Sequence, residues 1–455
     1  MHPLRLRLKN LSPGTILITG YAVAILTGGI LLTLPVAAQG QSLSFLDGLF
    51  TATSAMCVTG LAVVDTGTRF SLFGQLVILT LIQVGGLGIT TFSVYLFFYL
   101  RLGVGIRGRW ILHETLLHTP VDSMRDLVRS IFRLTLAIEG VGAVLLAVVF
   151  IPQQGVIKGA YYAVFHSVSA FCNAGFALFP DSLIGYRNHP LVNLTIMGLI
   201  ILGGIGFLVM REVAALTQAG TLRRRMSLHS KLVLLTSTVL IFGGALVIGL
   251  LEWRTGLRGM SFWEGFWTAM FQSVTARTAG FNTIDLNLFG APTIVFMIFL
   301  MFIGASPGSC GGGIKTTSLA IFFSILHSRL KGIAHTNVFR RTLPEEVVTK
   351  TLSLVMLAML LVGVAVFALL AVHGAGVPLL QSRGYFMDYF FEAVSAFGTV
   401  GLSLGITPQL SGAGKVIIIL LMFIGRVGLL TVAFTIARRS RPEAVRYGEE
   451  NIMIG

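Results

Sequence analysis

Charged side chains are scarce in this sequence: only 11% of its 455 residues are Asp, Glu, Lys or Arg. A soluble domain carries about 25%. With 55% hydrophobic residues and a mean hydropathy of +0.86, the folded chain would expose large apolar patches in water. The composition argues against an ordinary soluble protein and predicts that most of the chain is surrounded by lipid.

Acidic residues and cysteines are especially few. The 18 Asp and Glu residues lie mostly in expected loops and the nine His are scattered, so no catalytic cluster is found and we do not expect an enzyme. Cys57, Cys172 and Cys310 offer neither a disulfide framework nor metal-ligand spacing. The net charge of +15 would suggest nucleic-acid binding in a soluble protein. Here the basic residues lie between apolar runs, which favours membrane topology and no nucleic-acid partner.

Long apolar segments are abundant, and a bilayer is crossed by about 20 residues. Eight segments qualify, near residues 15–36, 71–98, 131–151, 190–210, 230–251, 291–325, 350–372 and 415–437. The loops after the second, fourth and sixth segments and the C-terminal tail are the most basic, with residues such as Arg101, Arg109, Arg211, Arg223, Arg329, Arg340, Arg438 and Arg439. Since cytoplasmic loops are enriched in Lys and Arg, both termini are predicted to be cytoplasmic.

A short motif recurs between the two segments of each successive pair. It occupies residues 50–61, 165–176, 271–281 and 391–402, and it has an aromatic residue, a Ser/Thr-Ala pair and a terminal Gly before an apolar residue. A second glycine motif follows, at Gly85, Gly203, Gly304 and Gly425, which lie 25, 28, 24 and 24 residues after the respective terminal glycines. Two motifs at near-constant spacing predict a fourfold internal repeat.

The repeats predict an all-α integral membrane fold with four parallel helix–pore loop–helix units, hence eight transmembrane helices around a central pore. Each unit has an even number of spans, so equal orientation about an axis along the membrane normal is possible. The expected units are residues 1–110, with pore loop and filter at 46–62, then 111–220, 221–345 and 346–455, the last including the C-terminal tail.

The glycine-ended loops are predicted to form a filter for a monovalent cation. Loops converging on one axis can present rings of carbonyl oxygens that replace the water shell of the ion, and glycine adopts the required backbone angles at low cost. The later filter segments are expected at 172–176, 277–281 and 398–402. Candidate filter residues are Cys57, Val58, Thr59, Gly60, Cys172, Asn173, Ala174, Gly175, Arg277, Thr278, Ala279, Gly280, Gly398, Thr399, Val400 and Gly401.

The sixth segment is interrupted by a Pro- and Gly-rich stretch, and such residues break helices. We interpret residues 304–315 as a flexible gating loop below the filter, with a packed kink as the alternative. A Walker phosphate loop needs Gly directly before Lys-Ser/Thr, but here Ile314 intervenes. Candidate gating residues are Gly304, Ala305, Ser306, Pro307, Gly308, Ser309, Cys310, Gly311, Gly312, Gly313, Lys315 and Arg426.

Two arginines lie within the predicted membrane region, where such residues are costly and usually functional. Arg426 could face the cavity, anchor the interrupted loop or repel cations from a shut gate. Arg277 lies inside the third filter motif, where a cation pointing into the pore would oppose conduction. We therefore expect its side chain behind the filter, with Glu392 as its partner.

At these motifs the chain resembles the Trk/Ktr/HKT superfamily of potassium transporters, and within it the KtrB-like membrane subunits. The resemblance implies K⁺ as the transported ion, a homodimer in the bacterial plasma membrane, and a cytosolic octameric ring of KtrA-type regulators. It also implies that ATP or ADP binds only to that partner and that Na⁺ often stimulates uptake. The 304–313 stretch matches the gating loop of the superfamily and Arg426 its gating arginine. The filters keep one matched glycine each, or two in the fourth repeat, which implies softer K⁺/Na⁺ discrimination than a full Thr-Val-Gly-Tyr-Gly signature.

The main alternative is an ion-coupled secondary transporter with a midplane site at a broken helix. Such a protein usually has inverted repeats, and the parallel fourfold repeat argues against it.

Overall fold

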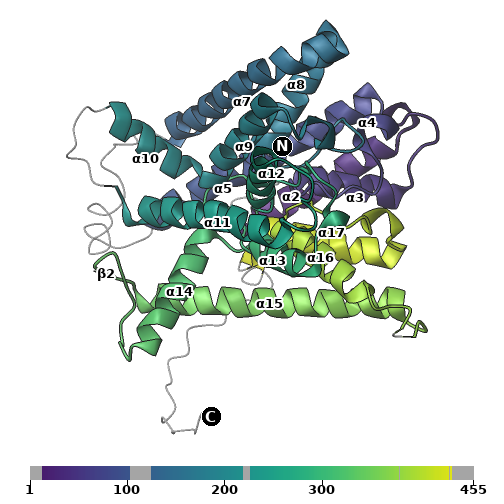
Figure 1. The fold of residues 1–455 in the computed structure, drawn as a ribbon. Helices are drawn as coiled ribbons and strands as arrows, with labels where there is room; N and C mark the ends of the chain where they lie inside the picture. Colours follow the sequence, from purple (N-terminus) through teal and green to yellow (C-terminus); the bar gives the residue numbers. More distant parts are fainter. Residues whose placement is uncertain (1–12, 103–123, 219–225, 379, 430, 433–455) are drawn as a thin grey trace, which may run out of the picture.

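The computed structural model describes residues 13–102, 124–218, 226–378, 380–429 and 431–432. This part of the chain is mostly helical (Figure 1). The helices are α2 (Pro13–Thr33), α3 (Phe45–Met56), α4 (Thr66–Arg69), α5 (Leu72–Leu102), α7 (Met124–Gln154), α8 (Val156–Phe171), α9 (Pro190–Ile205), α10 (Phe207–Gln218), α11 (Leu228–Glu252), α12 (Phe262–Thr275), α13 (Ala291–Phe302), α14 (Thr316–Leu330), α15 (Glu345–Gly374), α16 (Tyr385–Gly398) and α17 (Gly412–Val427).

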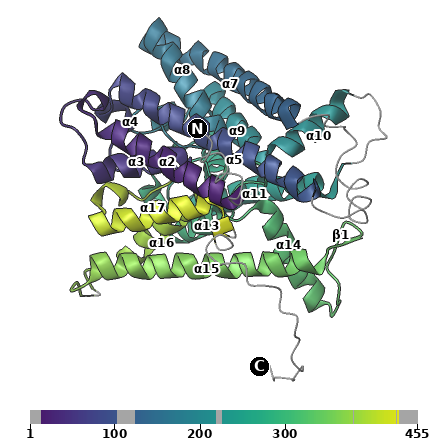
Figure 2. The ribbon, with the colours of Figure 1, turned by 180° about the vertical axis from the view of Figure 1, so that it is seen from behind.

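The remaining regular elements are short. Four 3-10 turns are η1 (Pro35–Ala37), η2 (Ile184–Tyr186), η3 (Leu286–Leu288) and η4 (Thr407–Gln409). Strands β1 (Asn337–Val338) and β2 (Arg341–Thr342) pair antiparallel. The strands and α10 lie at one end of the molecule, and α4 lies at the opposite end (Figures 1 and 2).

Several helices are suited to a bilayer. By length and composition, Gly14–Thr33, Val128–Gln154, Leu228–Glu252 and Glu345–Gly374 could each cross a membrane, and a fifth span results if α9 and α10 count as one bent pair. The long helices α7, α11 and α15 expose large apolar side chains, including Leu136, Val144, Val148, Phe242, Leu246, Leu250, Met359, Leu360 and Phe367. Such surfaces are unfavourable in water and suit contact with lipid.

Each expected apolar segment contains a helix, but two boundaries differ from the sequence expectation. The sequence analysis gives 190–210 as one apolar segment, but α9 and α10 meet within it at a bend of 102°. Gly206 stands at the bend with a φ of +97°, and the amide of Phe207 bonds to the carbonyl of Gly308 at 3.1 Å. The 415–437 segment likewise ends its first helix at Val427, before Gly428 with a φ of +96°. Glycine adopts this left-handed backbone cheaply, and this conformation ends the helix.

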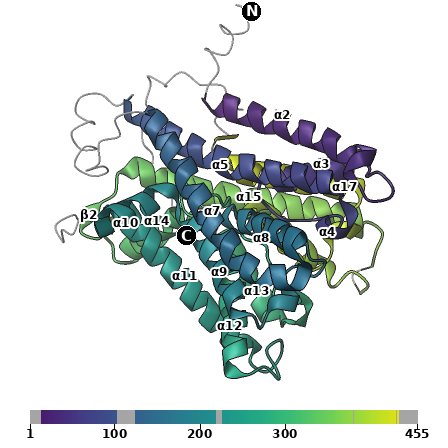
Figure 3. The same cartoon turned by 90° about the horizontal axis from the view of Figure 1, so that it is seen from above.

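Four shorter helices, α3, α8, α12 and α16, carry the repeated motif and are called here the motif helices. Their C-terminal turns are buried. Polar caps begin two of them: Ser44 accepts the amide of Asp47, and Ser261 forms a capping box with Glu264. Seen from above, α3 lies beside α5 and α17, and α12 lies on the opposite side of the molecule (Figure 3). The fold therefore brings the ends of four sequence-distant segments to its interior.

Some sequence predictions fall outside the described residues. They include basic residues of the 103–123 and 219–225 loops and of the tail, such as Arg109, Arg223 and Arg438.

Candidate functional site

The terminal glycines of the four motifs, Gly60, Gly175, Gly280 and Gly401, form a closed ring called here the glycine ring. A methyl group placed on Gly60 would lie 3.1 Å from the Cα atom of Gly175, and one on Gly175 would lie 3.0 Å from that of Gly280. One on Gly280 would lie 3.3 Å from the Cα atom of Gly401. One on Gly401 would lie 2.9 Å from that of Gly60, which closes the ring in sequence order.

The backbone of each loop alternates in handedness. Each ring glycine has a positive φ, between +68° and +97°. The residue two positions before it is also left-handed: Val58 at 55°, Asn173 at 59°, Thr278 at 68° and Thr399 at 51°. The intervening residues are not left-handed. Alternation of this kind turns successive carbonyl groups toward the same side. Left-handed L-residues cost about 1–2 kcal/mol each, so surrounding contacts must hold the loops in place.

The carbonyl oxygen just before each ring glycine lies close to the neighbouring ring glycine. A methyl group on Gly60 would lie 2.5 Å from the carbonyl oxygen of Ala174, and one on Gly280 would lie 2.5 Å from that of Val400. The corresponding amides bond back to the motif helices, for example Ala174 N to Ser169 O at 2.7 Å and Val400 N to Ser395 O at 2.8 Å. The amide donors are thereby satisfied within each loop, and carbonyl oxygens line the ring.

The Ser/Thr of each motif clamps its loop. Ser54 Oγ accepts the amide of Gly60 at 3.0 Å, and Ser395 Oγ accepts that of Gly401 at 3.1 Å. In the other two repeats the hydroxyl donates instead to the carbonyl after the glycine, from Ser169 to Phe176 and from Thr275 to Phe281, both at 2.8 Å. These bonds explain why each of the four motifs has Ser or Thr at this position.

The second glycine motif allows close helix packing. A side chain on Gly85, Gly203 or Gly425 would collide with the carbonyl oxygen at the end of a motif helix, that of Met56, Phe171 or Phe397 respectively. Gly304 differs, because a side chain there would collide with Gly312 of the interrupted stretch. The third repeat thus keeps the glycine but uses it to pack its own loop.

The 304–315 loop lies directly against the glycine-ended loops. Gly312 N donates to Thr399 Oγ1 at 3.0 Å, and a side chain on Gly311 would collide with Thr278. On its other side, Ser306 N bonds to Gly204 O and Cys310 N to Gly203 O, both at 3.0 Å. The helix break expected from the sequence is confirmed, and the loop that fills it contacts three different repeats.

Two cationic side chains hold carbonyl groups of this loop. Arg426, only 3% exposed, donates to the carbonyl oxygen of Cys310 and, at 2.6 Å, to that of Gly85. Lys315 Nζ donates to the carbonyl oxygen of Gly311 at 2.6 Å. Of the roles left open for Arg426, its contacts are those of a loop anchor.

Arg277 points away from the ring, as expected, but its predicted pairing with Glu392 is wrong. Arg277 donates to Ser237 of α11, to Oγ at 3.0 Å and to the carbonyl oxygen at 3.5 Å. Glu392 instead accepts hydrogen bonds from hydroxyl groups of Ser403 and Thr407. Arg277 extends toward the outer helix of its own repeat, while Glu392 is occupied by its own loop.

The remaining predicted residues lie beside the ring or in the loop. Gly398 packs against the carbonyl oxygen of Met301. Cys57 and Cys172 are buried as the C-caps of α3 and α8. Sequence reasoning missed buried Glu139 of α7, which accepts a hydrogen bond from Gln83 at 3.1 Å. An acidic residue inside an apolar segment was the available signal.

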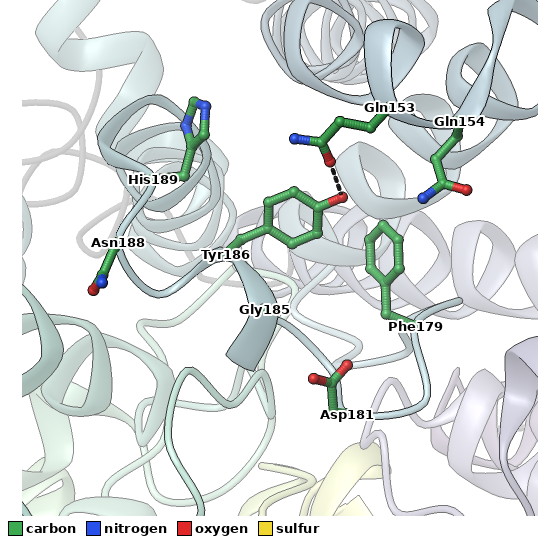
Figure 4. A pocket seen from close by; sticks show the side chains of 8 residues that line it. All are labelled: Gln153, Gln154, Phe179, Asp181, Gly185, Tyr186, Asn188 and His189. Atoms are coloured by element: carbon green, nitrogen blue, oxygen red, sulfur yellow. Dashed lines mark hydrogen bonds between the residues drawn. The ribbon is translucent and has the colours of Figure 1, made fainter.

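A surface hollow elsewhere is lined by residues of α7 and of the 179–189 loop, where Tyr186 donates to Gln153 at 2.7 Å (Figure 4). It contains none of the predicted filter or gating residues.

Known proteins resemble this chain over nearly its whole length. A family model described as "TrkH: Cation transport protein" matches residues 14–444. The Ktr system potassium uptake protein B of Bacillus subtilis is 40% identical, covering 98% of this chain and 97% of that protein. The potassium/sodium uptake protein NtpJ of Enterococcus hirae is 38% identical, covering 98% of each.

The crystal structure of the potassium transporter TrkH from Vibrio parahaemolyticus matches with a TM-score of 0.74 at 21% identity. The match covers 94% of this chain and 86% of that one, and it shows the shared fold. The resemblance to the Trk/Ktr superfamily and its KtrB-like members, suggested by the motifs, is confirmed. The chain belongs to the TrkH family of cation transport proteins.

Proposed function

We propose that the chain is the K⁺-translocating subunit of a bacterial K⁺ uptake system and that the glycine ring is its selectivity filter. The closed ring of four loops with alternating backbone handedness carries this proposal. Rings of carbonyl oxygens replace the hydration shell of a cation. Relatives named for potassium uptake, at 38–40% identity over full length, support K⁺ as the ion.

The filter consists of Val58–Gly60 and its equivalents, with Cys57, Cys172, Arg277 and Gly398 supporting it from behind. Each loop keeps one ring glycine, so fewer carbonyl layers are available than in a full Thr-Val-Gly-Tyr-Gly filter. K⁺/Na⁺ discrimination is accordingly modest. One relative is named for both potassium and sodium, which fits this expectation.

The 304–315 loop is the gate of this pathway. It contacts the side chains of Thr278 and Thr399, each two residues before a ring glycine, so the loop obstructs the way out of the filter. Arg426 and Lys315 stabilise this arrangement through its carbonyl groups. Opening therefore requires that these bonds be broken.

The architecture consists of eight spans in four parallel repeats, at 1–110, 111–220, 221–345 and 346–455. Each expected apolar segment contains a helix, and the outward side chains of the long helices are apolar. Both termini are cytoplasmic and the membrane is the bacterial plasma membrane.

The functional assembly is a homodimer on a cytosolic octameric ring of KtrA-type regulators, which bind the nucleotide. Na⁺ stimulates uptake. The support is the similarity to Ktr system proteins. The apolar tail 452–455, a candidate dimer contact, lies outside the described residues.

Complementation of a bacterium lacking K⁺ uptake tests the proposal. The wild-type chain with its regulatory partner restores growth at low K⁺, and deletion of residues 305–312 raises the rate of K⁺ uptake. No restoration by a chain present in the membrane would refute the function. Unchanged uptake by the deletion variant would refute the gate and favour an ion-coupled transporter with a site at the broken helix.

A further inference from the structure

A second polar position recurs on the motif helices, one turn before the clamping Ser/Thr. It is occupied by Thr51, His166, Gln272 and Glu392, each three residues before the clamping hydroxyl. Residues three apart lie on the same helix face. The second polar position therefore lies on the same helix face as the clamping hydroxyl group.

In the fourth repeat, the side chain at this second position binds the segment after the ring glycine. Glu392 is fully buried, and its two carboxyl oxygens accept Ser403 Oγ at 2.8 Å and Thr407 Oγ1 at 2.5 Å. Ser403 Oγ in turn accepts the amide of Gly405 at 3.0 Å. Within the described residues no ion pair involves Glu392, so hydroxyl groups alone satisfy the carboxyl group.

The second and third repeats use different side chains for the same purpose. His166 Nε2 accepts the amide of Leu178 at 3.3 Å, while its Nδ1 donates to the carbonyl oxygen of Tyr162 at 2.7 Å. Gln272 Nε2 donates to Thr283 Oγ1 at 3.4 Å. Leu178 and Thr283 each lie three residues after a ring glycine.

The first repeat departs from this pattern. Thr51 donates to the carbonyl oxygen of Asp47 within its own helix, at 2.9 Å. The segments after the ring glycines are therefore held in three of the four repeats, by three different chemical groups.

We propose that His166, Gln272 and Glu392 are specificity-determining positioning residues that hold the outer end of the filter, with Glu392 contributing most. The inference rests on the proposed function of the glycine ring. A ring of carbonyl oxygens discriminates between cations through its spacing and rigidity, and a buried side chain with two hydroxyl partners restrains the following segment more than a single long bond does. Loss of the brace widens the range of ring geometries, so smaller ions are tolerated better.

The test measures the K⁺/Na⁺ permeability ratio of the purified chain, reconstituted in liposomes with its activated regulatory partner, from the reversal potential under bi-ionic conditions. The variants are Glu392→Ala, Glu392→Gln and the double variant Ser403→Ala/Thr407→Val. Glu252→Ala is the matched control, because Glu252 is also a buried carboxyl group and accepts the amide of Gly290 at 2.9 Å, away from the ring.

We expect Glu392→Ala to lower the ratio about threefold to tenfold, the scale of one lost hydrogen bond. Glu392→Gln keeps an acceptor and a donor in place and stays within about twofold of wild type. The double variant Ser403→Ala/Thr407→Val should lower the ratio as much as Glu392→Ala does. Combining all three substitutions should lower it little further, because the effects of removing both partners of the same hydrogen bonds are not additive. The control leaves the ratio unchanged.

The inference is overturned if the permeability ratio of Glu392→Ala equals that of wild type. If Glu392→Ala fails to fold, an unchanged ratio in the double variant overturns it. A loss in Glu392→Gln as large as in Glu392→Ala also overturns it, because charge rather than bracing would then be decisive. If wild type itself shows no K⁺ permeability, the proposed function fails instead, so the two failures are distinguishable.

Discussion

Gly401 packs directly against Gly60, so the last glycine-ended loop closes onto the first. The same closure recurs nearer the surface, where Lys415 at the start of α17 forms an ion pair with Asp47 of α3 at 2.6 Å. Both contacts join the two repeats that are farthest apart in the sequence. The stability of the ring should therefore depend on this junction.

Breaking the ion pair should lower stability modestly. Lys415→Met and Asp47→Asn should each cost about 1 kcal/mol, the upper range for pairs that are partly exposed, and the double variant should cost no more than either alone. Thermal unfolding in detergent of the wild type, both single variants and the double variant measures these losses of stability. Fully additive losses would show that the two side chains do not interact.

Helix α9 contains a glycine under close contact and one in open space, which gives a matched comparison. Gly203→Ala should destabilise the protein by about 1–3 kcal/mol, because the added methyl group collides with the carbonyl oxygen of Phe171. Gly198 has no atom within 4 Å of such a methyl group, so Gly198→Ala should be neutral or stabilising by up to about 1 kcal/mol. Similar melting temperatures for both variants would contradict the packing described here.

Removing the loop anchor should open the pathway. Arg426→Gln loses the charge-assisted bonds to the carbonyl groups of Cys310 and Gly85, so basal K⁺ uptake without activation of the regulatory partner should rise several-fold, up to about tenfold. Arg426→Lys keeps a charged donor and should give an intermediate rate. Arg329→Gln, on the exposed part of α14, is the control. Uptake that falls in Arg426→Gln at equal protein level would refute the anchor role.

Much of the site could be predicted from the sequence because the repeats encode it. Four aligned glycines identified Gly60, Gly175, Gly280 and Gly401, and clustered Gly and Pro identified the helix break after Phe302. The repetition is informative because the loop of each motif needs a glycine with a positive φ at the same position.

Contacts between side chains could not be predicted in this way. Opposite charge favours a pair between Arg277 and Glu392, yet in the structure each side chain hydrogen-bonds to neutral partners instead. The bend at Gly206 was also missed, because a single glycine in an apolar helix is usually tolerated and only the carbonyl of Gly308 opposite it explains the break.

The most direct test of the central claim is the K⁺/Na⁺ permeability ratio of Gly280→Ser in liposomes, compared with Gly198→Ser. A side chain at Gly280 would lie 2.5 Å from the carbonyl oxygen of Val400 and would occupy a backbone with a φ of +79°. The account predicts that Gly280→Ser lowers the ratio about tenfold or more, since over-packing of about 1–3 kcal/mol falls on the carbonyl groups that we propose to bind the ion. Gly198→Ser should behave as wild type. A folded Gly280→Ser protein with wild-type selectivity would contradict the account.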